Sequence, residues 1–326
     1  MRSLVKRYGV WTVVSLVAYY LGTLFPLIGG TVFALLLGIL IRSLNPAQFV
    51  DFNYVSKQSG QVLKLGIIAL GLTLSFHVLV GVGAQSLKIT LFTMVAALIT
   101  ALWVGKQLQL DKQLHTLIAV GTAFCGGAAI AATTPIIKAK QTHMSLAIGT
   151  IFLYDIVAVL LFPMIGRMLH LSDLQFGLLA GSAVNSTPSV LAAALAYSSQ
   201  ANSYAAIVKI VRTLLLVPAT IILSLSFNQE GQSSSWTANK VFKLIPPFIV
   251  WFTIASLIAT FVPLPSFVTT SAKFLNKLGI TFGASGVGMG IDLQEVRQTG
   301  LKPFLVGGLA QTASLIVGLI CIYLFF

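Results

Sequence analysis

Long apolar segments separated by short loops run through nearly the whole chain, and they constrain its fold more than any other feature. The 326 residues are 57% hydrophobic and 8% charged, and the mean hydropathy is +0.95. A soluble domain carries roughly 25% charged residues, and a helix needs about 20 mostly apolar residues to cross a bilayer. We therefore predict an all-α polytopic membrane protein with one transmembrane domain over 1–326. The eleven expected transmembrane helices cover 8–24, 28–43, 62–83, 88–105, 114–136, 143–167, 174–198, 202–226, 243–262, 274–291 and 302–325.

The basic charge balance fits the loops of a membrane protein. Lys and Arg number 20 and Asp and Glu 7, so the formal net charge is +13. The positive residues gather in short loops, which argues against nucleic acid as a partner. Most flank one set of helix ends, which predicts a cytoplasmic N-terminus by the positive-inside rule. Lys138 and Lys140 fit this pattern badly, and a segment 114–136 that enters and returns as a hairpin would change both the helix count and the topology.

Two of the apolar segments are interrupted at corresponding positions. Residues 121–132 and 181–192 align without gaps, with Cys125 opposite Asn185, and each reads as a helix, a break and a second helix. Backbone N–H and C=O groups at membrane depth must be paired or must face water. Broken helices at matching positions are typical of the binding sites of secondary transporters.

The matched breaks also predict an internal repeat. Two repeat-like halves, about 28–168 and 174–326, would follow an additional helix at 1–24. These spacings alone do not show whether the halves are inverted. Glycines four residues apart at 177 and 181, and again at 279 and 283, predict close approach of neighbouring helices.

The second break carries hydroxyl and amide side chains. Thr187 is expected to cap the following half-helix, with Pro188 at its first position. A helix N-terminus is equivalent to about half a positive charge and attracts anions. We predict a substrate-binding group made of Asn185, Ser186, Thr187 and Ser189. The alternative is a proline kink repaired by the hydroxyl groups, with no ligand.

The first break is built from Cys125, Gly126 and Gly127. Glycines allow close approach to the backbone, so these three residues are predicted to expose main-chain groups to a substrate. The alternative is tight packing of small residues between helices. Cys125 has no second soft ligand at a suitable spacing, and no metal or other cofactor is expected.

Three charged residues lie inside predicted spans. Lys209 and Arg212 are three residues apart and share a helix face, and a buried charge in a membrane is a functional candidate. Lys209 could instead extend to the outer interface. Asp155 is expected to pair with one of them, which leaves a surplus positive charge that favours an anionic substrate. Alternatively, Asp155 binds and releases a proton as the coupling site.

The run from Gly121 to Pro135, the segment 176–197, the basic helix 205–218 and Gly288-Met-Gly-Ile-Asp-Leu resemble the YeiH-like family of bacterial inner-membrane proteins, which are described as sulfate exporters. That family is in turn distantly similar to bile-acid/sodium symporters and cation–proton antiporters. The resemblance implies inverted repeats, two discontinuous crossing helices, and a core that moves against a scaffold. The family pattern often has a histidine and an acidic residue where this chain has Asn185 and Ser186, which puts proton coupling there in doubt.

The function expected from these features is secondary active transport of a small inorganic or organic anion, such as sulfate or a sulfonate, by alternating access in the bacterial inner membrane. Alternatives are a sodium- or proton-coupled organic-anion symporter or a cation/proton antiporter that uses Asp155, and an anion channel. An intramembrane enzyme is disfavoured because H-E-x-x-H and G-x-S-x-G motifs are absent from the sequence. The expected partners are the anionic substrate, the lipid bilayer and, in a coupled mechanism, Na⁺ or H⁺. A homodimer is the one protein assembly that the sequence leaves open.

Overall fold

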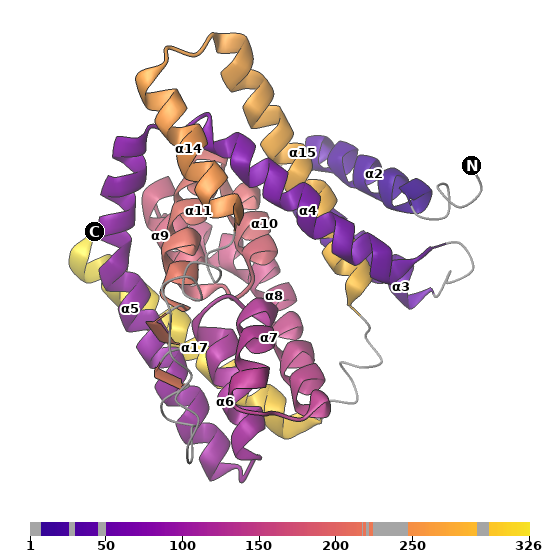
Figure 1. The fold of residues 1–326 in the computed structure, drawn as a ribbon, viewed down its shortest axis with the longest axis vertical. Coiled ribbons are helices and arrows are strands. Elements are labelled where there is room, and N and C mark those ends of the chain that lie inside the picture. Colours follow the sequence, from indigo (N-terminus) through magenta and orange to yellow (C-terminus); the bar gives the residue numbers. More distant parts are fainter. Residues whose placement is uncertain are drawn as a thin grey trace.

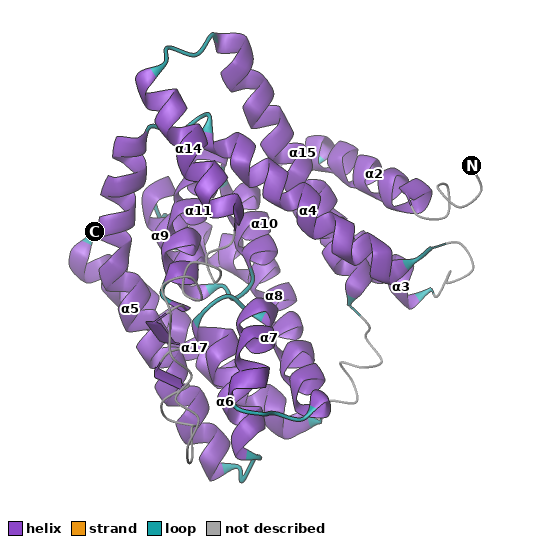
Figure 2. Ribbon diagram, in the orientation of Figure 1, coloured by secondary structure: helices purple, strands orange, loops and turns teal. Residues whose placement is uncertain are grey.

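The computed structural model describes residues 8–25, 30–44, 50–216, 218–219, 222–223, 247–291 and 300–326. Within these ranges the chain forms thirteen helices and no strand, which confirms the predicted all-helical class (Figures 1 and 2). The helices are α2 (Val10–Leu24), α3 (Gly30–Ser43), α4 (Phe52–Gly71), α5 (Phe76–Gln107), α6 (Lys112–Ala123), α7 (Gly127–Ile136), α8 (Gln141–Met168), α9 (Asp173–Ala183), α10 (Thr187–Tyr197), α11 (Ser199–Leu214), α14 (Pro247–Phe261), α15 (Ser266–Gly290) and α17 (Leu301–Phe325).

Several of these helices are suited to a membrane. Three described segments are long and apolar enough to cross one: Phe76–Gln107, Thr142–Met168 and Leu301–Phe325. Shorter apolar helices, among them α2, α3 and α14, accompany them. The described helices thus establish several candidate spans but not the predicted number of eleven. Parts of the predicted segments 202–226 and 243–262 lie outside the described residues.

The helix predicted over 62–83 is wrong. α4 ends at Gly71, and after a short turn Ser75 begins α5 as its N-cap by accepting a hydrogen bond from the backbone N–H of Val78. α5 then continues for 32 residues and takes in the whole segment predicted separately over 88–105. Apolar residues continue through the turn, so hydrophobicity alone does not mark it, whereas the capping serine does.

The helices form two groups (Figure 1). We call α2, α3, α4 and α15 the scaffold group, and α5 to α11 together with α17 the core group; α14 packs on α4 and α5. Small residues allow the scaffold helices to pack closely. A Cβ atom at Gly66 would lie only 3.1 Å from the Cα of Gly279. At Gly283 a Cβ would lie 2.9 Å from that of Leu63. The close approach predicted from the glycines at 279 and 283 is therefore confirmed.

The first interrupted segment folds back on itself. At the start of α6, the Nε2 atom of Gln113 donates to the carbonyl of Lys138, just beyond the end of α7, at 3.1 Å. A straight α6–α7 segment would hold these residues more than 30 Å apart, at about 1.5 Å per helical residue. The chain reverses at Gly126, whose φ of 66° suits glycine and few other residues. We call α6 and α7 hairpin 1.

The second interrupted segment also folds back. At the base of α9 and α10, the hydroxyl of Ser198 donates to Asp173 Oδ1 at 2.6 Å. Nearby, the rings of Phe176 and Tyr197 stack with centroids 4.0 Å apart. Residues 184–186 separate the two helices, and Val184 and Ser186 have an extended backbone. We call α9 and α10 hairpin 2. The expected pair of crossing discontinuous helices is thus replaced by two hairpins.

The hairpins enter the core group from opposite ends of α8. Hairpin 1 leads directly into the start of α8, and hairpin 2 follows directly after its end. With 28 residues, α8 is about 42 Å long. The 12 residues of α6 and the 11 of α9 span about 18 and 16 Å. Two hairpins of this depth, entering from opposite ends, bring their tips together near the middle of α8.

Candidate functional site

The tips of the two hairpins touch. A Cβ atom at Gly126 would lie 3.3 Å from the Cβ of Ser186, so the glycine allows the two backbones to meet. The break at 124–126 and the break at 184–186 are also the equivalent positions of the two aligned sequences. The structure therefore brings together the two groups of residues that the sequence singled out around Cys125 and Asn185.

Helix α11 packs beside hairpin 2 and carries Lys209 and Arg212, which contact both tips. A Cβ at Gly177 would lie 2.5 Å from the Cβ of Tyr204, and a Cβ at Gly181 would lie 2.5 Å from that of Val208. This confirms the close helix approach predicted from the glycines at 177 and 181. Because α11 starts at the base of the hairpin, its third turn places Lys209 at the level of the tips.

Arg212 binds both hairpins through backbone carbonyls. Its Nε donates to Ala123 at 2.7 Å and its Nη1 to Val184 at 2.7 Å, while Nη2 donates to Thr122. The first and last of these carbonyls lie at the end of α6, and that of Val184 lies at the end of α9. A planar guanidinium suits several fixed acceptors at once. Arg212 thus joins the two tips.

Lys209 makes a parallel set of contacts. Its ammonium donates to the carbonyls of Phe124 at 2.9 Å, Val184 at 3.2 Å and Asn185. An ammonium has three N–H donors, so all three are occupied. The side chain is 1% exposed and does not extend to an interface. The interpretation of Lys209 as an interfacial residue is therefore wrong.

The two cations satisfy helix ends that would otherwise be costly. The last carbonyls of a helix lack intrahelical partners and carry about half a negative charge. Here the C-terminal ends of α6 and α9 both point at Lys209 and Arg212, which are 1% and 0% exposed. The pairing compensates the carbonyl ends and the buried cations together. We infer that the main role of the pair is to position the tips.

Asp155 contacts the hairpin 2 tip at the start of α10. Its Oδ1 accepts a hydrogen bond from the backbone N–H of Ser186 at 3.2 Å, at the positive N-terminal end of α10. Among the described residues, no nitrogen of Lys209 or Arg212 lies within 4.0 Å of its carboxylate oxygens. The predicted ion pair is absent because the carbonyls occupy the cations and the helix N-terminus binds the carboxylate.

The N-cap of α10 is Ser186, one residue before the predicted Thr187. Its Oγ accepts from the backbone N–H of Ser189 at 3.4 Å and donates to the Ser189 hydroxyl at 2.8 Å. Pro188 falls in the first turn, where its missing N–H costs nothing. Ser186 and Ser189 therefore stabilise the start of α10 rather than facing an open site. Thr187 instead lines a small cavity beside Lys209.

Unpaired polar atoms gather at the hairpin 2 tip. Asn185 is 0% exposed, yet neither its Oδ1 nor its Nδ2 has a hydrogen-bond partner within the described part of the chain. Oδ2 of Asp155 is likewise buried and has no hydrogen-bond partner among the described residues. Leaving a buried polar group unpaired costs about 1–3 kcal/mol, and native proteins tolerate few such groups. These atoms are the ones most suited to bind a ligand, an ion or water.

The N-terminus of α7 provides a second set of free donors. No side chain caps this helix start at Gly126, and none of the described residues accepts from the N–H groups of Gly127 or Ala128. A Cβ at Gly127 would meet nothing within 4 Å, so there is open space beside it. Cys125 next to it is buried. Anions are favoured at such a helix start.

Two residues at the site were missed by the sequence analysis. Gln311 on α17 donates through Nε2 to the carbonyl of Ala183 at 2.9 Å, and Thr93 on α5 donates to that of Ser182 at 3.1 Å. Both support the end of α9. Gln311 carries an amide in the middle of a long apolar helix, and this is the signal that identifies it. A threonine in an apolar helix gives no comparable signal.

Comparison with known proteins places the chain in a family. The family model described as conserved hypothetical protein 698 matches residues 9–307. A UPF0324 membrane protein of Streptococcus agalactiae serotype V is 36% identical over 314 residues, covering 94% of this chain and 93% of the relative. One from Streptococcus pyogenes serotype M18 is 38% identical over 313 residues, with 94% and 92% covered. One from Clostridium tetani is 32% identical over 331 residues, with 96% of each covered.

A solved structure, the sodium proton antiporter MjNhaP1 from Methanocaldococcus jannaschii at pH 8, aligns with a TM-score of 0.30 and 12% identity over 99% of this chain and 100% of that chain. That score is too low to establish a shared fold. The family model and the relatives together confirm the resemblance expected from the sequence. The chain therefore belongs to the family of UPF0324 membrane proteins, described as conserved hypothetical protein 698, and is a multi-pass membrane protein.

Proposed function

We propose that this protein is a secondary transporter that binds a small anion where the tips of hairpins 1 and 2 meet. The observation that carries the proposal is the junction itself. Six hydrogen bonds from the fully buried Lys209 and Arg212 hold the carbonyl ends of both hairpins. Interrupted helices at membrane depth are tolerated where they border a wet or ligand-filled space.

The charge at the junction favours an anion. Lys209 and Arg212 carry two positive charges and Asp155 one negative charge, so the described residues leave a surplus of one. All three donors of Lys209 and three of the five N–H donors of Arg212 bind backbone carbonyls, so the cations are proposed to act mainly through their positive potential. The free N–H groups of Gly127 and Ala128 and the Nδ2 of Asn185 are the groups proposed to bind the anion directly. Sulfate and small sulfonates are the first substrates to test.

The two groups of helices suggest how access alternates. The scaffold group packs tightly through glycines, whereas few polar contacts join it to the core group. Thr31 donates to the carbonyl of Ala192 at 3.0 Å, and Asn202 donates to the side chain of Asn276 at 2.9 Å. We propose that the core group, with both hairpins, moves against the scaffold group and exposes the junction to one side at a time.

With the hairpin topology, the basic residues of the loops follow the positive-inside rule more closely than with the predicted spans. Because hairpin 1 returns to its starting side, Lys138 and Lys140 lie at the same end of the core group as Lys106. Arg167, at the far end of α8, moves to the opposite side. The positive-inside rule then assigns the Lys106 side, which is also proposed as the side of the N-terminus, to the cytoplasm.

Uptake into vesicles tests the proposal. Purified protein is reconstituted in liposomes, and labelled sulfate, sulfite and ethanesulfonate are each offered with unlabelled anion inside. We expect protein-dependent exchange of at least one anion, and its loss in Asn185→Ala. Exposed Lys57 on α4 provides the control, because Lys57→Gln removes a charge far from the junction and leaves exchange unchanged. No protein-dependent movement of any of the three anions would contradict the anion proposal.

A coupled mechanism is the second candidate, and the unpaired Oδ2 of buried Asp155 favours it. A carboxylate oxygen with no partner is available to a proton or a sodium ion. In this case Asp155→Asn still exchanges labelled anion at equilibrium but no longer concentrates it under an imposed proton or sodium gradient. Equal gradient-driven accumulation by wild type and Asp155→Asn would reject Asp155 as the coupling residue.

A further inference from the structure

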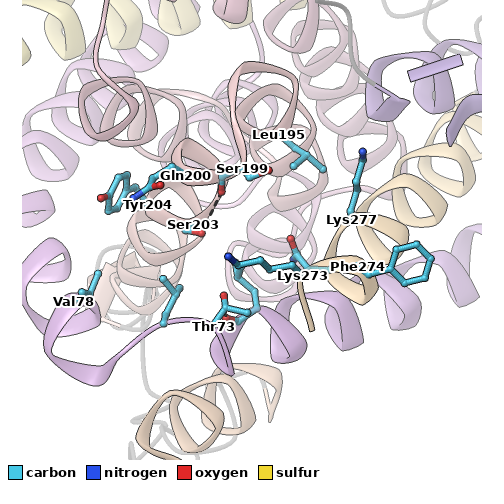
Figure 3. Close-up of a pocket in the computed structure, with 13 residues that line it drawn as sticks. Thr73, Val78, Leu195, Ser199, Gln200, Ser203, Tyr204, Lys273, Phe274 and Lys277 are labelled. Carbon is cyan, nitrogen blue, oxygen red and sulfur yellow. Dashed lines mark hydrogen bonds between the residues drawn. The ribbon is translucent and has the colours of Figure 1, made fainter. Parts of the chain in front are cut away.

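A cavity of about 520 Å³ lies at the boundary between the scaffold and core groups, away from the junction (Figure 3). The end of α4, the start of α5, the end of α10, the start of α11 and the first half of α15 surround it. It is thus on the side of the core group from which hairpin 2 enters. Its volume falls within the range of small-molecule sites, about 300–1,000 Å³.

The polar wall of the cavity is positively charged. The side chain of Lys273 extends across the cavity between Thr73 and Ser203 (Figure 3). Lys273 makes no hydrogen bond or ion pair with any described residue, and no Asp or Glu lines the cavity. Lys277 is also in the lining, with its ammonium 5.1 Å from the ring centroid of Tyr19. Lys273 is therefore the charge available to a ligand.

The start of α11 adds donors to this wall. Ser199 and Gln200 line the cavity in the first turn of the helix, where N–H groups lack intrahelical partners. Ser203 lies one turn further along the same face, but its hydroxyl already donates to the carbonyl of Ser199 at 3.2 Å. The N–H groups of this helix start, the Ser199 hydroxyl and the Gln200 amide are therefore the donors that, together with the Lys273 ammonium, suit the oxygens of a carboxylate or sulfonate.

Apolar side chains also line the cavity. Leu70, Leu74, Leu195 and Phe274 form this apolar part of the wall. A cavity of about 520 Å³ is much larger than an inorganic oxyanion needs, so the apolar wall leaves room for a short hydrocarbon body. The lining therefore fits an organic anion with a charged head and an apolar tail better than sulfate.

The same helices lead from this cavity toward the hairpin tips. A much smaller cavity, about 10 Å³, is lined by Lys209 and Thr187 at the junction and by Ile67, Leu191 and Ile210. Leu191 lies one turn before Leu195 on α10, and Ile67 lies one turn before Leu70 on α4. The two cavities thus follow one another along the boundary between the groups, and the smaller one, with about 10 Å³ and a mostly apolar lining, is the constriction before the junction.

We infer that the larger cavity is an entry site for a small organic anion, which Lys273 binds through its charged head before the anion passes the constriction to the junction. The assignment as an entry site rests on the proposed transport function, whereas binding in the cavity does not. A lipid head group has the same anionic chemistry, so the test separates it from a soluble anion.

Calorimetric titration of the purified full chain with butanesulfonate tests the binding. We expect butanesulfonate to bind more tightly than sulfate, because of the apolar wall. Loss of one charge-assisted contact in Lys273→Gln weakens binding about tenfold, and Lys273→Arg retains most of it. Lys57→Gln, the matched charge removal on α4 outside the cavity, leaves the affinity unchanged. No binding to wild type, or equal affinity in wild type and Lys273→Gln, overturns the inference.

Two further experiments distinguish a soluble anion from a lipid head group, and the entry site from the transport proposal. In nanodiscs, adding phosphatidylglycerol to phosphatidylcholine leaves butanesulfonate binding unchanged if the site takes a soluble anion, whereas competition by the lipid overturns that assignment. Asn185→Ala is expected to lose exchange but keep butanesulfonate affinity. Lys273-dependent binding without flux of any anion refutes the transport proposal alone. If butanesulfonate does not bind to the wild type, and Lys273→Gln transports anions as fast as the wild type, the entry site alone is refuted.

Discussion

At the scale of single residues, Lys209 and Arg212 show how a membrane protein can hold two broken helices together. Each cation contacts the last carbonyls of α6 and α9, and each is fully enclosed. A buried charge is expensive without good partners. Here the partners are the ends of two helices, whose carbonyls are equally expensive to leave unpaired. The pair therefore stabilises the junction at which substrate is proposed to bind.

Arg212→Gln is expected to lower the free energy of unfolding by about 3–5 kcal/mol, because breaking a buried charged contact leaves unpaired groups behind. Arg212→Lys keeps the charge but not the fork of three donors, so we expect it to recover only part of the loss. Thermal unfolding in detergent followed by size-exclusion chromatography measures both, with Lys57→Gln as the reference for a removed charge. Wild-type stability in Arg212→Gln would refute the role of Arg212 in joining the tips.

Neighbouring glycines at the tip of hairpin 1 provide a matched pair. Gly126→Ala is expected to destabilise by about 1–3 kcal/mol, because its φ of 66° strains a side chain and the new Cβ would press on Ser186. Gly127→Ala adds a methyl group in open space and is expected to leave stability unchanged. It is nevertheless expected to reduce anion exchange by crowding the free donors. Equal stability of the two variants would contradict the tip geometry.

At the scale of elements, the two hairpins were only partly predictable. The breaks follow from glycine, serine and proline in apolar segments, and their positions agree with the aligned sequences. The reversal of each hairpin depends instead on contacts between distant residues, such as Gln113 with Lys138 and Ser198 with Asp173. Only the misplaced Lys138 and Lys140 indicated a hairpin in advance. The merging of 88–105 into α5 was missed because Gln85, Ser86 and Lys88 resemble a break between two apolar segments, whereas α5 continues through them.

Cysteine labelling tests the hairpin topology. In a background without Cys125 and Cys321, Lys106→Cys and Lys138→Cys are expected to react with an impermeant maleimide from the same side of the membrane. Met168→Cys, at the end of α8, is expected to react from the opposite side. All three native side chains are exposed. Labelling of positions 106 and 138 from opposite sides would mean that α6 and α7 cross the membrane after all.

At the scale of the whole molecule, the division into scaffold and core groups predicts which contacts transport must break. Ser199 on α11 and Lys277 on α15 line one cavity of about 140 Å³ across the boundary. Cross-linking Ser199→Cys to Lys277→Cys with a short thiol reagent is expected to reduce anion exchange to background. Cross-linking Asp173→Cys to Ser198→Cys, within the core group, is expected to preserve it. Undiminished exchange across the locked boundary would contradict movement between the groups.

The sequence predicted which residues lie together at the candidate site better than it predicted the contacts that they make. Lys209, Arg212, Asp155 and the two breaks do lie together. Their partners were not predictable, because charge counting pairs an aspartate with a cation, whereas the folded chain offers helix ends to both. The unpaired state of Asn185 likewise emerges only when every neighbouring donor and acceptor is placed.

Charge movement on a solid-supported membrane tests the central claim most directly, that the meeting point of the two hairpin tips is an anion site. A rapid jump in anion concentration over reconstituted protein is applied to wild type, Asn185→Ala and Lys57→Gln. We predict a transient current in wild type and Lys57→Gln, and its loss in Asn185→Ala while that variant keeps wild-type thermal stability. An identical current in folded Asn185→Ala, or no current in wild type with any of the sulfate, sulfite and sulfonate anions, would contradict the claim.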